Sequence, residues 1–166
     1  MRILAIDPGN TESGYAVIDS TTCRAIAIGK TSNEQLLDRL FEWLDGGEGI
    51  VDHISIEMIK SYGMPVGAEV FETCVWIGRF AQVVDSFGAF GMPCDLVYRA
   101  DVKLHLCHTT KAKDANITQA LIDRFAAGEP NRGKGTKADP GWFFGFKADI
   151  WQAYALAVLT ADTRVA

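Results

Sequence analysis

Three acidic residues of this chain stand at the ends of apolar segments. Asp7 follows the apolar run 3–6, Glu57 follows the run 53–56, and Asp149 precedes a last segment rich in Ala, Leu and Val. A carboxylate at the end of a core strand is rigid and partly removed from water, and its oxygens are ligands that Mg²⁺ prefers. The three acids are therefore candidates for a divalent metal site. Two also have a plain structural interpretation, Asp7 as a turn cap and Asp149 as a favourable charge at a helix N-terminus.

Strands and helices must position these acids. Apolar runs bounded by Pro, Gly or Asn are typical of buried strands, and apolar residues at steps of three and four are typical of helices. Short turns join the first three strand candidates, which predicts an antiparallel meander. If the strand that ends at Glu57 lies beside the first strand, Glu57 and Asp7 are neighbours at one sheet edge. Strands are expected at 2–7, 13–19, 23–29, 53–56 and 94–98, and helices between Ser32 and Gly46 and at 66–87, 114–127 and 147–162.

Composition limits the class of protein. A chain of 166 residues that is 48% hydrophobic can bury a substantial core, and the sequence predicts a single domain over residues 1–166. The chain has neither a run of about eighteen apolar residues nor a secretory leader, so we expect a cytoplasmic protein. Its four cysteines form no C-x-x-C pair and lie mostly in apolar stretches, which favours reduced, buried thiols.

Basic residues are concentrated in one part of the chain. The net charge of −5 argues against an indiscriminate nucleic-acid binder. A local phosphate-binding surface is one interpretation of the cluster, and a solvated loop face is the other. The clustered residues are Lys103, Lys111, Lys113, Arg132, Lys134 and Lys137.

Two further segments bear on function. The expected helix 66–87 is apolar almost all round, so it should be buried on more than one side, either within the chain's own core or against a second subunit. Residues 128–146 are rich in Gly, Pro and Lys and read as a long loop, which inside a compact domain is often functional.

These motifs resemble a known family. The matching pieces are Ile6-Asp7-Pro8-Gly9 with Gly14-Tyr15, then Ile56-Glu57, Tyr98 with Val102-Lys103, and Ala148-Asp149. Together they are similar to the ribonuclease H-like superfamily and, within it, to the RuvC-type Holliday junction resolvases, especially short divergent members from phages and prophages. The resemblance implies an α/β fold with a five-stranded mixed sheet. Its first three strands would form the antiparallel meander, the last two would run parallel to the first, and helices would flank the sheet.

The resemblance also implies a catalytic site. Asp7, Glu57 and Asp149 would be metal-binding catalytic carboxylates that hold Mg²⁺, replaceable by Mn²⁺, with two ions in each site. The family carries a fourth acid three residues after the helix Asp, where this chain has Gln152. An amide oxygen can bind Mg²⁺ but brings no charge. Asp114 or Glu12 would have to compensate, although no pattern in the sequence brings either one to the site.

The implied reaction is hydrolysis of a phosphodiester in a four-way or other branched DNA junction. Lys60 and Tyr62, just after Glu57, would approach the branch point, and the six clustered basic residues would bind phosphates. Because a four-way junction is nearly two-fold symmetric, the resemblance implies a homodimer, for which the helix 66–87 is the candidate interface. A bacterial cytoplasm would be the setting, with the gene carried by the host or a phage.

Other functions stay open at this point. A ribonuclease H-like nuclease acting on RNA or flaps, similar to the YqgF proteins, would carry the same acids. A non-catalytic junction-binding protein is favoured by Gln152 and by the pI of about 5.1. The segment 7–14 also resembles the phosphate-binding hairpin of actin-like sugar kinases, but those need two such domains.

Overall fold

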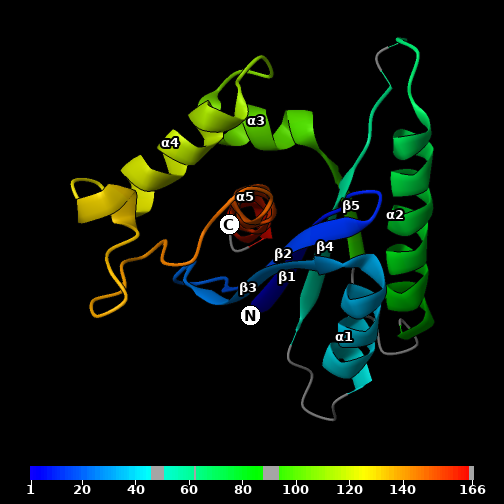
Figure 1. Ribbon diagram of the computed structural model, residues 1–166, viewed down its shortest axis with the longest axis horizontal. Coiled ribbons are helices and arrows are strands. Elements are labelled where there is room, and N and C mark those ends of the chain that lie inside the picture. The colour runs from blue at the N-terminus through cyan, green and yellow to red at the C-terminus, as the bar shows by residue number, and fades with distance from the viewer. Residues whose placement is uncertain (46–50, 62, 88–93, 165–166) are drawn as a thin grey trace.

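The computed structural model, which describes residues 1–45, 51–61, 63–87 and 94–164, has a mixed sheet between two layers of helices (Figure 1). Its five strands are ordered β3-β2-β1-β4-β5. Strands β1, β2 and β3 form the antiparallel meander, and β4 and β5 run parallel to β1. The fold class predicted from the sequence is therefore confirmed. The strands are β1 (Arg2–Asp7), β2 (Glu12–Asp19), β3 (Ala25–Ser32), β4 (His53–Met58) and β5 (Cys94–Tyr98).

The helices divide between the two faces of the sheet. On one face lie α1 (Asn33–Asp45) and α2 (Ala68–Phe87), and on the other lies α5 (Ile150–Arg164). Helices α3 (Arg99–Cys107) and α4 (Asp114–Phe125) arch over α5, so that α5 runs between them and the sheet (Figure 1). Residues 150–161 of α5 are all buried, which explains why this segment carries almost no charge.

Several elements differ from the sequence-based predictions, and three of the differences have a clear cause. Strand β3 begins at Ala25 because Cys23 adopts a left-handed φ of 58° in a turn that the Asp19 carboxylate stabilises. Helix α5 begins at Ile150, since Ala148 has a φ of 38° that ends any helix there. Helix α3 is absent from the predicted helices, because its nine residues, with Val102 as the single buried one, show no helical period of apolar side chains.

Helix α2 is buried on one side only within this chain. It packs Trp76, Ile77 and Phe80 against the sheet, whereas Phe71 and Val75 are 64% and 61% exposed. The expectation of burial on more than one side is therefore wrong for the single chain. The cysteines are free thiols, but Cys74 on this helix is exposed, so the expectation that they are buried holds only in part. No described helix is both long enough and apolar enough to span a bilayer.

The segment 128–146 is held in place by aromatic side chains. It contains a short 3₁₀ turn, η2 (Pro130–Gly133), and an isolated bridge between Gly135 and Pro140. The Trp142 ring stacks on Phe125 of α4 at 5.1 Å between ring centres, and the Arg24 guanidinium lies 4.4 Å from the centre of the Trp142 ring. The predicted loop is thus irregular in backbone but anchored to the α5 side of the core.

Alternation along the strands decides which side chains face α5. On β1, Leu4 and Ile6 pack with α1 and α2, whereas Ile3 and Ala5 pack with α5. Successive side chains of a strand point to opposite faces, so the next odd residue, Asp7, belongs to the α5 face. On β4 the Ser55 hydroxyl bonds Thr160 of α5, and by the same alternation Glu57 also lies on the α5 face.

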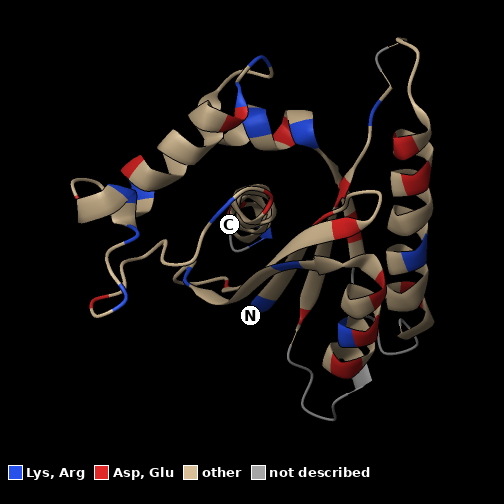
Figure 2. Cartoon of the chain, in the orientation of Figure 1, with Lys and Arg blue, Asp and Glu red and all other residues tan. Residues whose placement is uncertain are grey.

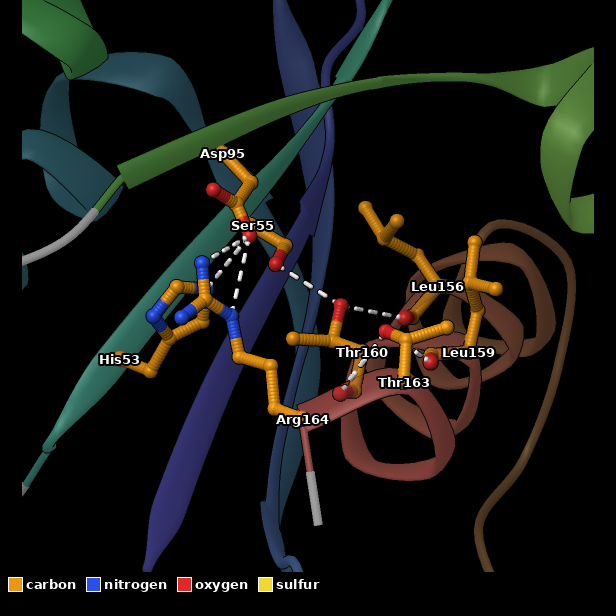
Figure 3. Close-up of polar contacts among 8 residues, drawn as sticks. All are labelled: His53, Ser55, Asp95, Leu156, Leu159, Thr160, Thr163 and Arg164. Atoms are coloured by element: carbon orange, nitrogen blue, oxygen red, sulfur yellow. Dashed lines mark hydrogen bonds and ion pairs between the residues drawn. The ribbon is translucent and has the colours of Figure 1, made fainter. Parts of the chain in front are cut away.

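Polar contacts fix the C-terminal end of α5 to the start of β4 and to β5 (Figure 3). Ser55 and Thr160 share a hydrogen bond of 2.8 Å. The Asp95 carboxylate accepts from Arg164 at 2.7 Å and contacts His53 Nε2 at 3.0 Å. His53 is fully buried, and its Nδ1 has no partner among the described residues. This network sets the depth of α5 on the sheet at the end opposite Asp7.

Candidate active site

Asp7 and Glu57 lie side by side at one edge of the sheet. Strands β1 and β4 are parallel with Ile6 opposite Ile56, so the next residue of each strand is an acid. No described residue forms a salt bridge with Asp7. Burial, together with the negative charge of Glu57, raises the pKa of Asp7 to about 8. The folded protein therefore places a carboxyl group where its charge is poorly compensated.

Gly14 brings the third acid to the same place. It stands opposite Asp7 on β2, and a Cβ added to it would lie 2.8 Å from the Asp149 carbonyl oxygen and 2.9 Å from the Asp149 Cβ. Only glycine leaves room for this contact. The preceding Ala148 has a φ of 38°, a conformation that residues other than glycine rarely adopt and that often marks a functional turn. The motif Asp7…Gly14 thus contains both the first acid and the glycine against which Asp149 packs.

Two adjoining clefts expose these acids. The first, of about 320 Å³, is lined by Asp7, Asp149 and Gln152 together with Arg99 and Asp114. Glu57 opens into the second cleft, of about 270 Å³, with Lys60, Lys103 and again Arg99. All four residues predicted to be catalytic therefore line this region. Asp114, which the sequence could not place, lines it as well.

Arg99 bridges two of the acids. One guanidinium nitrogen, Nη1, donates to both carboxylate oxygens of Glu57 at 3.0 Å, and Nη2 lies 2.9 Å from Asp114 Oδ1. Burial raises the pKa of Glu57, and the Arg99 charge works in the opposite direction. Sequence reasoning missed Arg99. Its position directly after β5, at the sheet edge that carries Asp7 and Glu57, was the available signal.

Lys30 on β3 forms a salt bridge with Asp149, the third predicted acid. Its Nζ lies 2.7 Å from Asp149 Oδ2 and 3.5 Å from Glu12 Oε2. The hydrogen bond to Asp149 raises the pKa of the Lys30 amine. Lys30 stands opposite Gly14 in the β2–β3 register, so one rung of the sheet carries Lys30, Gly14 and Asp7. Sequence reasoning missed this residue too, because pairing across strands leaves no local pattern.

The acids do not form a ready-made ligand cluster. Within the described part of the chain, no three His, Cys, Asp or Glu side chains are grouped so that they could hold a metal ion. Glu57 and Asp149 instead pair with Arg99 and Lys30. Asp7, however, stands beside a second acid, forms no salt bridge with a described residue, and shares its cleft with Asp149 and Gln152. Carboxylate and amide oxygens are donors that Mg²⁺ prefers, so these residues fit Mg²⁺ in donor type but are not grouped as a ligand cluster.

Most of the basic residues predicted to contact DNA belong to α3, to the α3–α4 connection or to the segment after α4, and Figure 2 shows basic residues along these elements. Lys60 and Lys103 line the cleft of Glu57, and Lys60 also lies 5.6 Å from the centre of the Tyr98 ring. Arg132 and Lys134 line a third hollow, which shares Trp151 with the first cleft. Lys111, Lys113 and Lys137 are exposed, and Tyr62 lies outside the described residues.

Acidic residues predominate on the opposite layer. Helix α1 carries Glu34, Asp38 and Glu42, and α2 carries Glu69 and Glu72 (Figure 2). The net charge of −5 is therefore unevenly distributed: the α1–α2 layer is more acidic than the α3–α4 layer. The clefts open on the more basic side.

Comparisons with known proteins agree on the architecture. No protein-family model matches the sequence, and no curated protein sequence does either. The solved structure of Thermus thermophilus RuvC superposes with a TM-score of 0.65 at 14% identity, over 99% of this chain and 96% of that one. T. thermophilus RuvC in complex with Holliday junction substrate gives 0.61 at 15% identity, with the same coverage. The chain has a RuvC-like fold. The resemblance drawn from the sequence motifs is thereby confirmed at the level of fold.

Proposed function

We propose that this protein is a metal-dependent endodeoxyribonuclease that cuts branched DNA, with the four-way junction as its principal substrate. The proposal depends on one observation: Asp7, Glu57 and Asp149 come from three distant segments and line adjoining clefts at one sheet edge. The T. thermophilus RuvC structure with a Holliday junction supports the choice of substrate. Residues 1–166 would act as one nuclease domain in a bacterial cytoplasm, encoded by the host or a phage.

The acids would hold the metal. Asp7 would be the central ligand, with Glu57 and Asp149 on either side, and Gln152 would offer an amide oxygen in place of a fourth charge. A pair of Mg²⁺ or Mn²⁺ ions bound there would supply an acidified water and neutralise charge on the leaving oxygen. The chain itself would contribute a rigid sheet edge and a fixed helix N-terminus that hold these side chains in place.

The basic side of the molecule would bind the DNA backbone. Lys60 and Lys103 flank Glu57, while Arg132 and Lys134 extend the surface beyond Trp151. Phosphate contacts of this kind position a duplex without reading its sequence. Lys111, Lys113 and Lys137 would add to this surface, and Tyr62 is proposed to meet the branch point.

A homodimer would deliver paired cuts. A four-way junction is nearly two-fold symmetric, so two symmetric incisions call for two active sites related by a two-fold axis. Helix α2 exposes Phe71 and Val75 beside an open groove at Gly78 and Val83. We assign this surface to a second copy of the chain, since an isologous contact needs one self-complementary apolar patch.

Cleavage of a labelled four-way junction with immobile arms tests the proposal. Wild-type protein in Mg²⁺ should give paired symmetric nicks, and Asp7→Asn should give none. Asp123→Asn, which changes an exposed acid on the same side of the molecule as the site, should cut like the wild type. Duplex DNA, a flap and an RNA hairpin complete the panel. Preference for RNA or flaps would redirect the assignment within the nucleases, and tight junction binding without cleavage in Mg²⁺ or Mn²⁺ would refute an enzymatic role.

A further inference from the structure

Arg99 occupies the middle of the acid group. Its guanidinium contacts both oxygens of Glu57 and one oxygen of Asp114, all within 3.0 Å. The side chain is 29% exposed and Glu57 is 15% exposed, so water screens their attraction only in part. Arg99 also lines both clefts and thus forms the wall between them.

The contacts of Arg99 are those a bound cation would make. Both carboxylate oxygens of Glu57 accept from Arg99 Nη1, and Asp114 pairs with Arg99 Nη2. Lys30 does the same for Asp149 on the other side of Asp7. Asp7 alone has no such partner among the described residues. A divalent ion that approaches Glu57 therefore meets a carboxylate already neutralised by a fixed positive charge.

We propose that Arg99 is a built-in counter-cation of the site, a positioning residue that orients Glu57 in the metal-free protein and weakens the binding of divalent metal there. The inference depends on the proposed metal-dependent function. A divalent ion must displace the guanidinium from Glu57 or share the carboxylate with it. In either arrangement the repulsion between Arg99 and the metal lowers the metal affinity.

Calorimetric titration of Ca²⁺ into the DNA-free protein tests this directly, because it reads metal binding without turnover. Arg99→Met removes the charge and keeps much of the side-chain length, so Ca²⁺ should bind roughly tenfold more tightly than to the wild type. Arg99→Lys keeps a charge but cannot reach both acids with a planar fork, so its affinity should fall between the two. Junction cleavage by Arg99→Met should fall even as metal binding tightens, because Glu57 loses its support.

Arg124→Met is the matched control. Arg124 makes a comparable two-nitrogen contact with Asp162, at 2.6 and 2.8 Å, away from the clefts. Its loss should leave Ca²⁺ affinity unchanged. If Arg99 only stabilised the fold, Arg99→Met would bind Ca²⁺ more weakly than the wild type or equally well, whereas the proposal expects tighter binding.

Unchanged or weaker Ca²⁺ binding by folded Arg99→Met overturns the inference. If Arg99→Met does not fold, Arg99→Lys carries the test, and affinity at or below that of the wild type has the same meaning. Failure of the proposed function looks different: wild-type protein and all variants would bind no Ca²⁺ and cut no junction. If metal binding and cleavage both depend on Asp7 but Arg99→Met binds Ca²⁺ with wild-type affinity, the inference about Arg99 is wrong and the proposed function stands.

Discussion

Gly14→Ala should displace Asp149 and show whether the third acid depends on this glycine. The added Cβ would stand 2.8 Å from the Asp149 carbonyl oxygen and 2.9 Å from its Cβ, whereas ordinary contacts begin at 3.4 Å. Both neighbours belong to the backbone or its first side-chain atom, so no flexible group can move aside. The turn at Asp149 must retreat by roughly 0.6 Å, and overpacking of this kind costs about 1–3 kcal/mol.

Two assays measure the effect of Gly14→Ala. Urea unfolding should shift its midpoint down by about 0.5–1.5 M, given a typical slope for a domain of this size. Junction cleavage should fall by roughly tenfold, since misplacement by about 1 Å can cost a hundredfold. Gly67→Ala is the control, because an added Cβ there meets nothing within 4 Å. Wild-type stability and a wild-type cleavage rate in Gly14→Ala would refute the packing argument, and the urea midpoint tests it even if no cleavage is found.

Three further predictions address charge and assembly. Asp7→Asn should have a higher melting temperature than the wild type at pH 8 in EDTA. The substitution removes a carboxyl group whose pKa is raised to about 8 by burial, so its charge is unfavourable in the folded protein. An equal or lower melting temperature would contradict this. Burial lowers the pKa of His53 below 6.5, so just below this pH His53 binds a proton more readily in the unfolded chain than in the folded one. The free energy of unfolding should therefore fall as pH drops below 6.5, by at most about 1.4 kcal/mol per pH unit for this group. Unfolding at pH 7 and pH 5 should show a smaller loss in His53→Phe, and an equal loss would exclude His53 as the cause. Val75→Glu should halve the mass measured by light scattering if α2 forms the dimer interface, and a wild-type dimer that persists in this variant would place the interface elsewhere.

Much of the fold could be predicted because its signals are local. Each strand of the sheet is a short apolar run bounded by turn residues, and Asp7 and Glu57 are the next residues after two such runs. Parallel neighbours end at the same edge, so a single assumption about pairing brings the two acids together. The predicted site was therefore a consequence of strand order, which the motifs of the RuvC-type resolvases suggested.

The charge partners of those acids could not be predicted in the same way. Lys30 reaches Asp149 because β3 pairs with β2 in one particular register, and a shift of one residue would turn its side chain to the other face. Arg99 reaches Asp114 because α4 folds back beside α3, and the angle between two helices leaves no trace in a pattern of apolar residues. Three of the four acids that line the clefts could be predicted from the sequence, but Asp114 and the basic partners of the acids could not.

The unequal charge of the two helical layers affects how the molecule would meet DNA. A protein with a net charge of −5 is repelled by a polyanion when it is far away. At separations near the Debye length of about 8–10 Å, the nearer layer dominates the field, so an encounter led by α3 and α4 is attractive and one led by α1 and α2 is rejected. If the protein binds DNA as proposed, the acidic layer would orient the encounter. It would discourage the protein from coating ordinary duplex and favour collisions in which the clefts already face the phosphates.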